Sequence, residues 1–229
     1  MLDYLLELDK QLLLWFNGSD SLFFDEMMDA FTTTSTWIPL YLSLFYLVIK
    51  NNNSMQKILL IVACAGFCVL FAGAFDDLIV KPSVARWRPT HDPQIGPLVD
   101  VIKNYRGSEY GFFSAHASNT FSIALFFCLL VRSRLLSFAL VSWSLLNCYT
   151  RMYLGLHYPS DILCGLLWGT IVGGLVYMAY CRISLRLGTP VNYTSSLCTS
   201  TGYMKREVEV VVCVLLLTFV YAALRACVQ

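Results

Sequence analysis

The sequence predicts an all-α protein that is embedded in a membrane as a bundle of six transmembrane helices, preceded by an amphipathic segment at the membrane surface. Hydrophobic residues make up 57% of the 229-residue chain and charged residues only 14%, well below the quarter that is usual in soluble domains. The apolar residues also gather into stretches long enough to cross a bilayer. A net charge of +1 provides no general basic field for binding nucleic acid.

A transmembrane helix needs about 20 mostly apolar residues. Six stretches meet or approach this length, and the fourth is the shortest. They cover residues 33–50, 58–80, 114–131, 135–150, 161–181 and 208–226. The chain has no internal repeat and no low-complexity segment, so residues 1–229 are predicted to form a single membrane-embedded domain.

The first 31 residues have a different pattern. Within residues 1–16, leucines recur at helical spacing, and polar residues such as Asp3, Glu7 and Lys10 form an opposite stripe. This pattern is typical of a helix that lies in the membrane interface. A turn at Asn17-Gly18 and an acidic segment over 19–31 predict a second short interfacial helix.

The distribution of basic residues predicts the orientation of the bundle. The loops that follow the first, third and fifth predicted spans carry eight Lys and Arg residues, accompanied only by Glu207 and Glu209 as acids. The opposite side has as many bases but holds the other thirteen acids. Because cytoplasmic loops are enriched in Lys and Arg, we expect the loop over 81–113 and both chain ends to face outward. In a bacterial inner membrane, that side is the periplasm.

The nine cysteines are an odd number, and most lie in apolar runs. The nearest pair, Cys64 and Cys68, has no histidine nearby and makes a poor metal site. We therefore expect all nine to be small, buried, apolar residues.

Three polar clusters lie at the ends of predicted helices on the outward side. They are Lys81–Pro89, with Arg86 and Arg88; Phe113-Ser114-Ala115-His116; and Thr150-Arg151 followed by His157-Tyr158-Pro159-Ser160-Asp161. Lys81, Arg88 and Arg151 are three cations that can converge on one small anion. An arginine guanidinium can donate two parallel hydrogen bonds to two oxygens of one phosphate, and lysine adds a point charge.

The second cluster stands where the third transmembrane helix should begin. Ser114 is therefore predicted to be the N-cap of that helix. The backbone N–H groups of Ala115 and His116 would then point at the same anion, helped by the helix dipole. Together with the three cations, this arrangement predicts a phosphate cradle that needs no metal ion.

Two histidines of these clusters can supply the chemistry. Asp161, four residues after His157, can accept a hydrogen bond from one ring nitrogen and leave the other free to attack phosphorus. The expected intermediate is a phosphohistidine. His116 would protonate the leaving oxygen and then activate water. His91 belongs to no cluster and is interpreted as a solvated loop residue.

Each cluster also has a purely structural explanation. The bases of the first could anchor the chain at lipid headgroups. His116 could be a polar residue at a helix start, and Arg151 and Asp161 could form an ion pair across a loop. Asp76 and Asp77 could be interfacial or could pair with a base of the cluster. These explanations weaken because all three clusters fall on one side of the bundle.

In order and spacing, the clusters resemble the three motifs of the type-2 phosphatidic acid phosphatase family, which shares its pocket with the vanadium haloperoxidases. The first motif (Lys, six residues, Arg-Pro) is complete from Lys81 to Pro89. The third (Ser-Arg, five residues, His, three residues, Asp) differs only at Thr150, which replaces serine. The second (Pro-Ser-Gly-His) is degenerate, with Phe113 in place of proline and Ala115 in place of glycine.

The resemblance implies a helical bundle, phosphohistidine chemistry and no metal or other cofactor. It also implies which residues bind phosphate: Lys81, Arg88, Ser114 and Arg151. Haloperoxidase activity does not fit, since those relatives are soluble.

Similarity to small bacterial members of the family implies a membrane lipid phosphate or pyrophosphate as substrate. An outward-facing site suits recycling of a carrier lipid, so undecaprenyl pyrophosphate is the first choice. A lipid A phosphatase and a phosphatidylglycerol phosphate phosphatase are the alternatives. A small anion or lipid transporter is the alternative outside enzymes, but transporters often carry their charges near the middle of the membrane, whereas here they lie at helix ends. The oligomeric state is not indicated.

Overall fold

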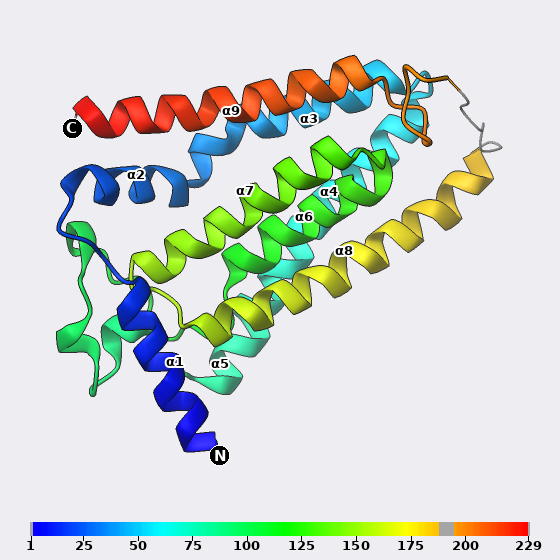
Figure 1. Ribbon diagram of the computed structural model, residues 1–229. Coiled ribbons are helices and arrows are strands. Elements are labelled where there is room, and N and C mark those ends of the chain that lie inside the picture. Colours follow the sequence, from blue (N-terminus) through cyan, green and yellow to red (C-terminus); the bar gives the residue numbers. More distant parts are fainter. Residues whose placement is uncertain (1, 188–194, 229) are drawn as a thin grey trace.

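The computed structural model describes residues 2–187 and 195–228, which fold into helices joined by turns and one long loop (Figure 1). The α-helices are α1 (Leu2–Phe16), α2 (Leu22–Thr32), α3 (Ile38–Asn51), α4 (Met55–Phe75), α5 (Lys81–Val84), α6 (Ala115–Val131), α7 (Arg134–Tyr153), α8 (Pro159–Leu187) and α9 (Lys205–Val228). No β-strand occurs within these described ranges, so the predicted all-α class is confirmed for them.

Helix α6 is the centre of the bundle and packs against α4, α7 and α8. Its contact with α8 is the closest, because glycines recur there at every fourth position. At Gly165, Gly169 and Gly173, an added Cβ would lie 2.7 Å from a backbone carbonyl oxygen of α6 or its N-cap. Small residues at this spacing let two membrane helices approach backbone to backbone. The start of α6 and the start of α8 are thereby held together.

Helices occupy all six of the predicted transmembrane stretches, but the count of six spans is not confirmed. By length and composition, three helices could each cross a membrane alone: Met55–Val84, Pro159–Leu187 and Lys205–Val228. A fourth span is possible if the bent pair Leu22–Thr32 and Thr34–Asn51 acts as one. Helix α6 is apolar but short, and α7 is not among the helices that are apolar enough to cross a membrane. Six spans therefore stay a prediction.

The two predicted N-terminal helices are present as α1 and α2. Helix α2 is also part of the bundle, because it packs against α7 and α9 and meets the following helix at an angle of 69°. Trp37 stabilises this bend: its Nε1 atom donates to the carbonyl oxygen of Phe31 (2.9 Å), and its ring packs against Trp143. The bend places Thr32, the last residue of α2, at the end of the bundle that carries the polar clusters.

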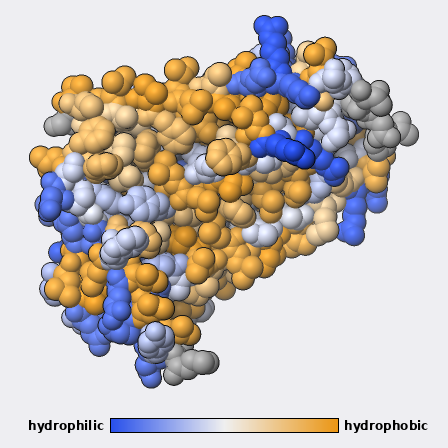
Figure 2. All heavy atoms as spheres, viewed as in Figure 1, coloured by the Kyte–Doolittle hydropathy of each residue, from blue (hydrophilic) through white to orange (hydrophobic). Residues whose placement is uncertain are grey.

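The two ends of the bundle differ in what they carry. The turns between α3 and α4, α6 and α7, and α8 and α9 lie at one end, whereas both termini, α5 and the α7–α8 connection lie at the other (Figure 1). The grouping of loops that the sequence predicts is therefore correct. On the visible face, hydrophobic side chains cover the long middle and hydrophilic ones gather at the two ends (Figure 2), as expected of a protein that spans a membrane.

One expectation about the cysteines is wrong. Cys64, Cys68 and Cys148 are buried, but Cys213 and Cys227 on α9 are exposed. Both belong to an apolar helix at the edge of the bundle, where a small apolar residue can face lipid as readily as protein.

Candidate active site

The three polar clusters meet at one end of the bundle (Figure 1). Helix α4 continues through a π-helical turn, Asp76–Val80, into α5 and the segment that contains Arg88. The first turn of α6 carries His116, and the connection from α7 to α8 carries His157. Direct contacts join them: Arg88 touches His157, and the backbone N–H of Ser114 donates to the carbonyl oxygen of Asp161 (3.1 Å).

His157 is buried and is in contact with Arg88. Its Nε2 atom lies 3.0 Å from Nη1 of Arg88. Arginine has only donors, so this ring nitrogen must present its lone pair and Nδ1 must carry the hydrogen. Burial lowers the pKa of His157 well below its ordinary value of 6.5, and the charges of Arg88 and Arg151 lower it further. The ring is therefore neutral, which is the form that a nucleophile requires.

Asp161 faces the other side of the His157 ring, but the hydrogen bond expected from the sequence is not formed. Oδ2 of Asp161 lies 3.7 Å from Nδ1 of His157, beyond hydrogen-bonding distance. That oxygen instead accepts from the backbone N–H of Tyr158 (3.0 Å), and Oδ1 accepts from Arg86 (2.7 Å). A shift of a few tenths of an ångström upon substrate binding would close the gap, since catalytic hydrogen bonds often tighten only in the complex.

The second cluster begins α6 as the sequence predicts. Ser114 is the N-cap of α6, and its hydroxyl accepts from the backbone N–H of Ala117 (3.4 Å). Ala115 and His116 then supply the first N–H groups of the helix, which have no partner within the helix. The His116 ring lies against the backbone of Thr32, and the charges of Arg151 and two other bases reach it.

Arg151 and Arg88 each retain an unused donor. Nη1 of Arg151 donates to the Thr32 hydroxyl (2.7 Å), and Arg88 donates to the carbonyl oxygen of Leu156 (3.0 Å) and the hydroxyl of Ser108 (3.1 Å). The Nε atoms of both arginines are buried and have no hydrogen-bond partner among the described residues. Buried donors of this kind are costly unless something accepts from them. An anion beside His157 would satisfy both.

Lys81, the third predicted cation, is paired with carboxylates. Its ammonium lies 3.0 Å from Asp76 and 2.5 Å from Asp77. Asp76 is fully buried and also accepts from the backbone N–H of Phe113 (3.1 Å). It therefore ties the first cluster to the second. Of the two explanations that the sequence left open for these acids, the structure supports pairing with a base.

Several polar residues of the site carry no signal in the sequence. Thr32 lies more than 80 residues from either of its partners, His116 and Arg151. Arg86 occupies an unspecified position of the first motif, and Asp9, which binds it (2.7 Å), belongs to the amphipathic helix α1. The signal that could have revealed Asp9 is its position on the apolar face of that helix, between Leu5 and Leu13, where a carboxylate needs a partner.

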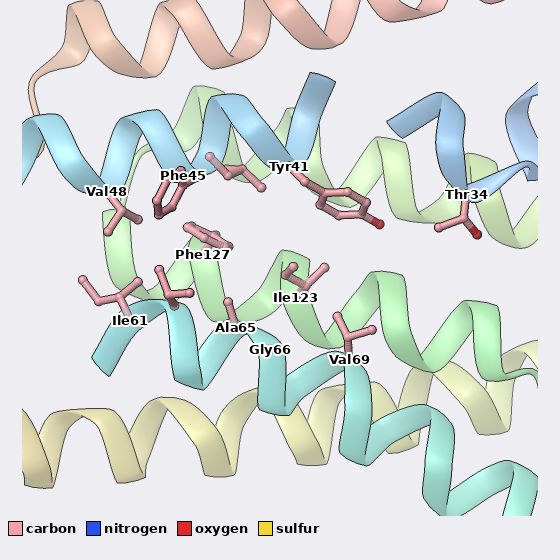
Figure 3. Close-up of a pocket in the computed structure, with 12 residues that line it drawn as sticks. Thr34, Tyr41, Phe45, Val48, Ile61, Ala65, Gly66, Val69, Ile123 and Phe127 are labelled. Atoms are coloured by element: carbon pink, nitrogen blue, oxygen red, sulfur yellow. The ribbon is translucent and has the colours of Figure 1, made fainter. Parts of the chain in front are cut away.

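An apolar groove of about 360 Å³ begins near the site and runs between α3 on one side and α4 and α6 on the other (Figure 3). Thr34 lies at the end nearer the site, two residues after Thr32, and Val48 and Ile61 lie at the far end. Tyr41 and Phe127 line the space between. The groove has the chemistry to hold a hydrocarbon chain.

Comparison with known proteins agrees with this arrangement. Residues 56–183 match the model of the PAP2 superfamily. The lipid A 4'-phosphatase of Bacteroides thetaiotaomicron is 40% identical over 194 residues, which is 83% of this chain and 86% of that protein. The lipid A 4'-phosphatase of Porphyromonas gingivalis is 33% identical over 180 residues, or 78% and 75% of the two chains. The decaprenylphosphoryl-5-phosphoribose phosphatase of Mycobacterium tuberculosis is 37% identical over 116 residues, or 51% and 58%. No solved structure matches.

The helical fold, the apolar surface and these matches define a membrane lipid phosphatase. More particularly, the chain belongs to the PAP2 superfamily.

Proposed function

We propose that this protein removes a phosphate from lipid A, the 4'-phosphate being the first candidate. The observation that carries a phosphatase site is the pair of buried arginines, Arg88 and Arg151, each with an unpartnered Nε donor, around His157, whose Nε2 lone pair faces Arg88. The choice of lipid is supported by the two relatives that cover most of the chain, both of which are named lipid A 4'-phosphatase.

This choice replaces undecaprenyl pyrophosphate, the first choice from the sequence. The outward-facing site suited a carrier lipid, but it suits any lipid whose phosphate lies on that face of the membrane. A polyprenyl-linked phosphate is the second candidate, because the mycobacterial relative carries a decaprenyl substrate in its name, although it covers only 51% of the chain.

The proposed reaction has two steps. Nε2 of His157 attacks phosphorus and forms an N–P bond, while the bond between phosphorus and the sugar oxygen breaks and His116 gives its proton to that oxygen. In the second step, water attacks the phosphorus of the phosphohistidine, and His116 takes a proton from that water. The N–P bond breaks, and inorganic phosphate leaves. Arg88, Arg151, Lys81 and the N–H groups at the start of α6 stabilise the charge on the equatorial oxygens. In this scheme Lys81 exchanges a carboxylate partner for phosphate.

The groove between α3 and α4 is the proposed place for an acyl chain. One end is at Thr34, two residues after Thr32, which binds Arg151, and most of the other lining residues are apolar. A lipid could then enter sideways from the bilayer, with its phosphate at the outward end of the bundle. In a bacterial inner membrane, that end would face the periplasm.

The test is a phosphate-release panel with the purified protein in detergent. Lipid A, undecaprenyl pyrophosphate, phosphatidylglycerol phosphate and phosphatidic acid are compared by kcat/KM. Lipid A is expected to be the best substrate, and mass spectrometry of the product should locate the lost phosphate at the 4' position. A better rate with undecaprenyl pyrophosphate would restore the earlier choice. Tight binding of lipid A without release of phosphate would favour the transporter.

A further inference from the structure

Arg86 lies between two carboxylates that come from opposite parts of the chain. Its Nη1 atom donates to Oδ1 of Asp161 (2.7 Å), and its Nη2 atom donates to Oδ2 of Asp9 (2.7 Å). Its guanidinium carbon is 4.1 Å from the centre of the Tyr158 ring, a distance at which a cation is attracted to the face of an aromatic ring. Both terminal nitrogens of Arg86 thus bind protein groups, and none of these groups belongs to the phosphate cradle.

Asp9 also binds the first turn of α8. Its Oδ1 atom accepts from the backbone N–H of Ser160 (2.9 Å), and its Oδ2 atom accepts from the Ser160 hydroxyl (2.5 Å). A carboxylate from α1 therefore caps α8 from outside, where the helix dipole favours negative charge. Asp9 is 7% exposed, because it lies on the apolar face of the amphipathic helix, one turn from Leu5 and one turn from Leu13. Burial of a carboxylate on such a helix needs partners of this kind.

The charges of this cluster balance one another. Burial opposes the charge on Arg86, but Asp161 and Asp9 outweigh that effect and raise the pKa of its guanidinium above the ordinary value. Asp161 is fully buried. Without Arg86 its carboxylate would be left in the interior beside the neutral His157, and an uncompensated buried charge is strongly unfavourable. Arg86 therefore supplies the opposite charge that this carboxylate needs and fixes its rotation.

We propose that Asp9 and Arg86 are positioning residues of the active site, and that helix α1 acts on His157 through them. Arg86 holds one oxygen of Asp161, which leaves the other oxygen facing Nδ1 of His157. Asp9 holds Arg86 and the first turn of α8, from which Asp161 projects. This inference rests on the proposed roles of His157 and Asp161, and it adds a second layer that orients a reacting group.

The test uses the full-length protein in detergent with p-nitrophenyl phosphate, so that lipid identity plays no part. Asp9→Asn removes one charge and keeps the shape of the side chain. Its kcat should fall by roughly ten- to hundredfold, the range found for outer partners of ligands in metal sites. The inhibition constant of inorganic phosphate should stay within about twofold, because the cradle is intact. Asp9→Glu should recover part of the loss. Glu7→Gln, an exposed change on the same helix, is the matched control and should behave as wild type.

A double variant separates positioning from a merely structural role. If Asp9 acts through Asp161, then Asp9→Asn should lower kcat little further in an Asp161→Asn background. An undiminished second loss would overturn the proposal, as would Asp9→Asn with the activity of Glu7→Gln. Should Asp161→Asn be too slow to measure, the phosphate inhibition constant and the Asp9→Glu recovery decide. A fully active Asp161→Asn would refute the orienting role of Asp161 and with it this proposal, whereas the proposed function itself fails if His157→Ala keeps its activity. Thermal unfolding of each variant shows whether it has folded.

Discussion

The Nε2 atom of His157 lies 3.0 Å from the Nη1 atom of Arg88. Since a guanidinium cannot accept a hydrogen bond, Arg88 selects the tautomer in which this nitrogen carries no hydrogen and its lone pair accepts from Arg88. The Nε donor of the same guanidinium is buried and has no partner among the described residues. Arg88 would thus prepare the nucleophile before phosphate arrives and bind the phosphate afterwards.

Replacement of Arg88 by lysine should therefore damage catalysis although the charge is retained. An ammonium cannot bind two phosphate oxygens in a fixed plane. We expect kcat/KM for p-nitrophenyl phosphate to fall by about 10²- to 10³-fold, the cost of losing one pre-arranged donor. Arg134→Lys, at the far end of the bundle, is the control. Comparable rates for the two variants would show that only the charge of Arg88 matters.

The roles of the two histidines can be separated by trapping the intermediate. His157→Ala should abolish both the release of phosphate and the labelling of the protein by a ³²P-phosphate ester. His116→Ala should still react with p-nitrophenyl phosphate, whose leaving group needs no proton, and release a single burst of p-nitrophenol. Hydrolysis of the phosphohistidine would then be slow for lack of a base. A labelled His157→Ala protein, or a His116→Ala protein without a burst, would contradict this assignment.

Stability should depend on pH through His157. Burial holds its pKa well below 6.5 in the folded protein, whereas the unfolded chain takes up a proton near 6.5. The unfolded state thus binds more protons below that pH, so this part of the stability is present above 6.5 and is lost as the pH falls. The melting temperature of the wild type should therefore fall more steeply between about pH 7 and about pH 5 than that of His157→Gln, which cannot titrate. Parallel curves would argue against a neutral, buried His157.

The sequence predicted the local features of the site and missed those that depend on distant contacts. Ser114 was recognised as an N-cap because the apolar stretch that follows it sets the helix start. Asp161 was placed beside His157 because it follows four residues later, in the first turn of the next helix. Asp9 could not be linked to Ser160, since the two are 151 positions apart and only the packing of α1 on α8 joins them. The number of spans stays open because α6 is short and because α7, although long enough, is not among the helices that are apolar enough to cross a membrane.

The groove between α3 and α4 makes a prediction about lipid chains. A Cβ at Gly66, which lines the groove, meets no atom within 4 Å, so Gly66→Phe should fill the groove without disturbing the helix. We expect kcat/KM for lipid A to drop about tenfold, equivalent to 1.4 kcal/mol, while the rate with p-nitrophenyl phosphate is unchanged. Gly174→Phe is the control, because Gly174 has equally open space and lies on α8. Equal losses in the two variants would place the acyl chain elsewhere.

The proposed cradle consists of side chains and backbone N–H groups, so chelation should have little effect. Activity with EDTA is expected to match activity without it, because Arg88, Arg151 and Lys81 supply the positive charge that a metal ion provides in other phosphatases. Loss of activity upon chelation, with recovery when a divalent cation is added back, would refute the cradle.

The π-helical turn Asp76–Val80 sets the direction in which the first motif points. A π turn accommodates one residue more than an α turn, and each residue of an α-helix advances the side chains by about 100° around the axis. If Asp76–Val80 formed a regular α-helix instead, Lys81 and everything after it would be rotated by that angle. Lys81 would then leave Asp76, although every residue of the motif would still be present. The π turn absorbs the additional residue and is therefore as much a part of the site as the side chains.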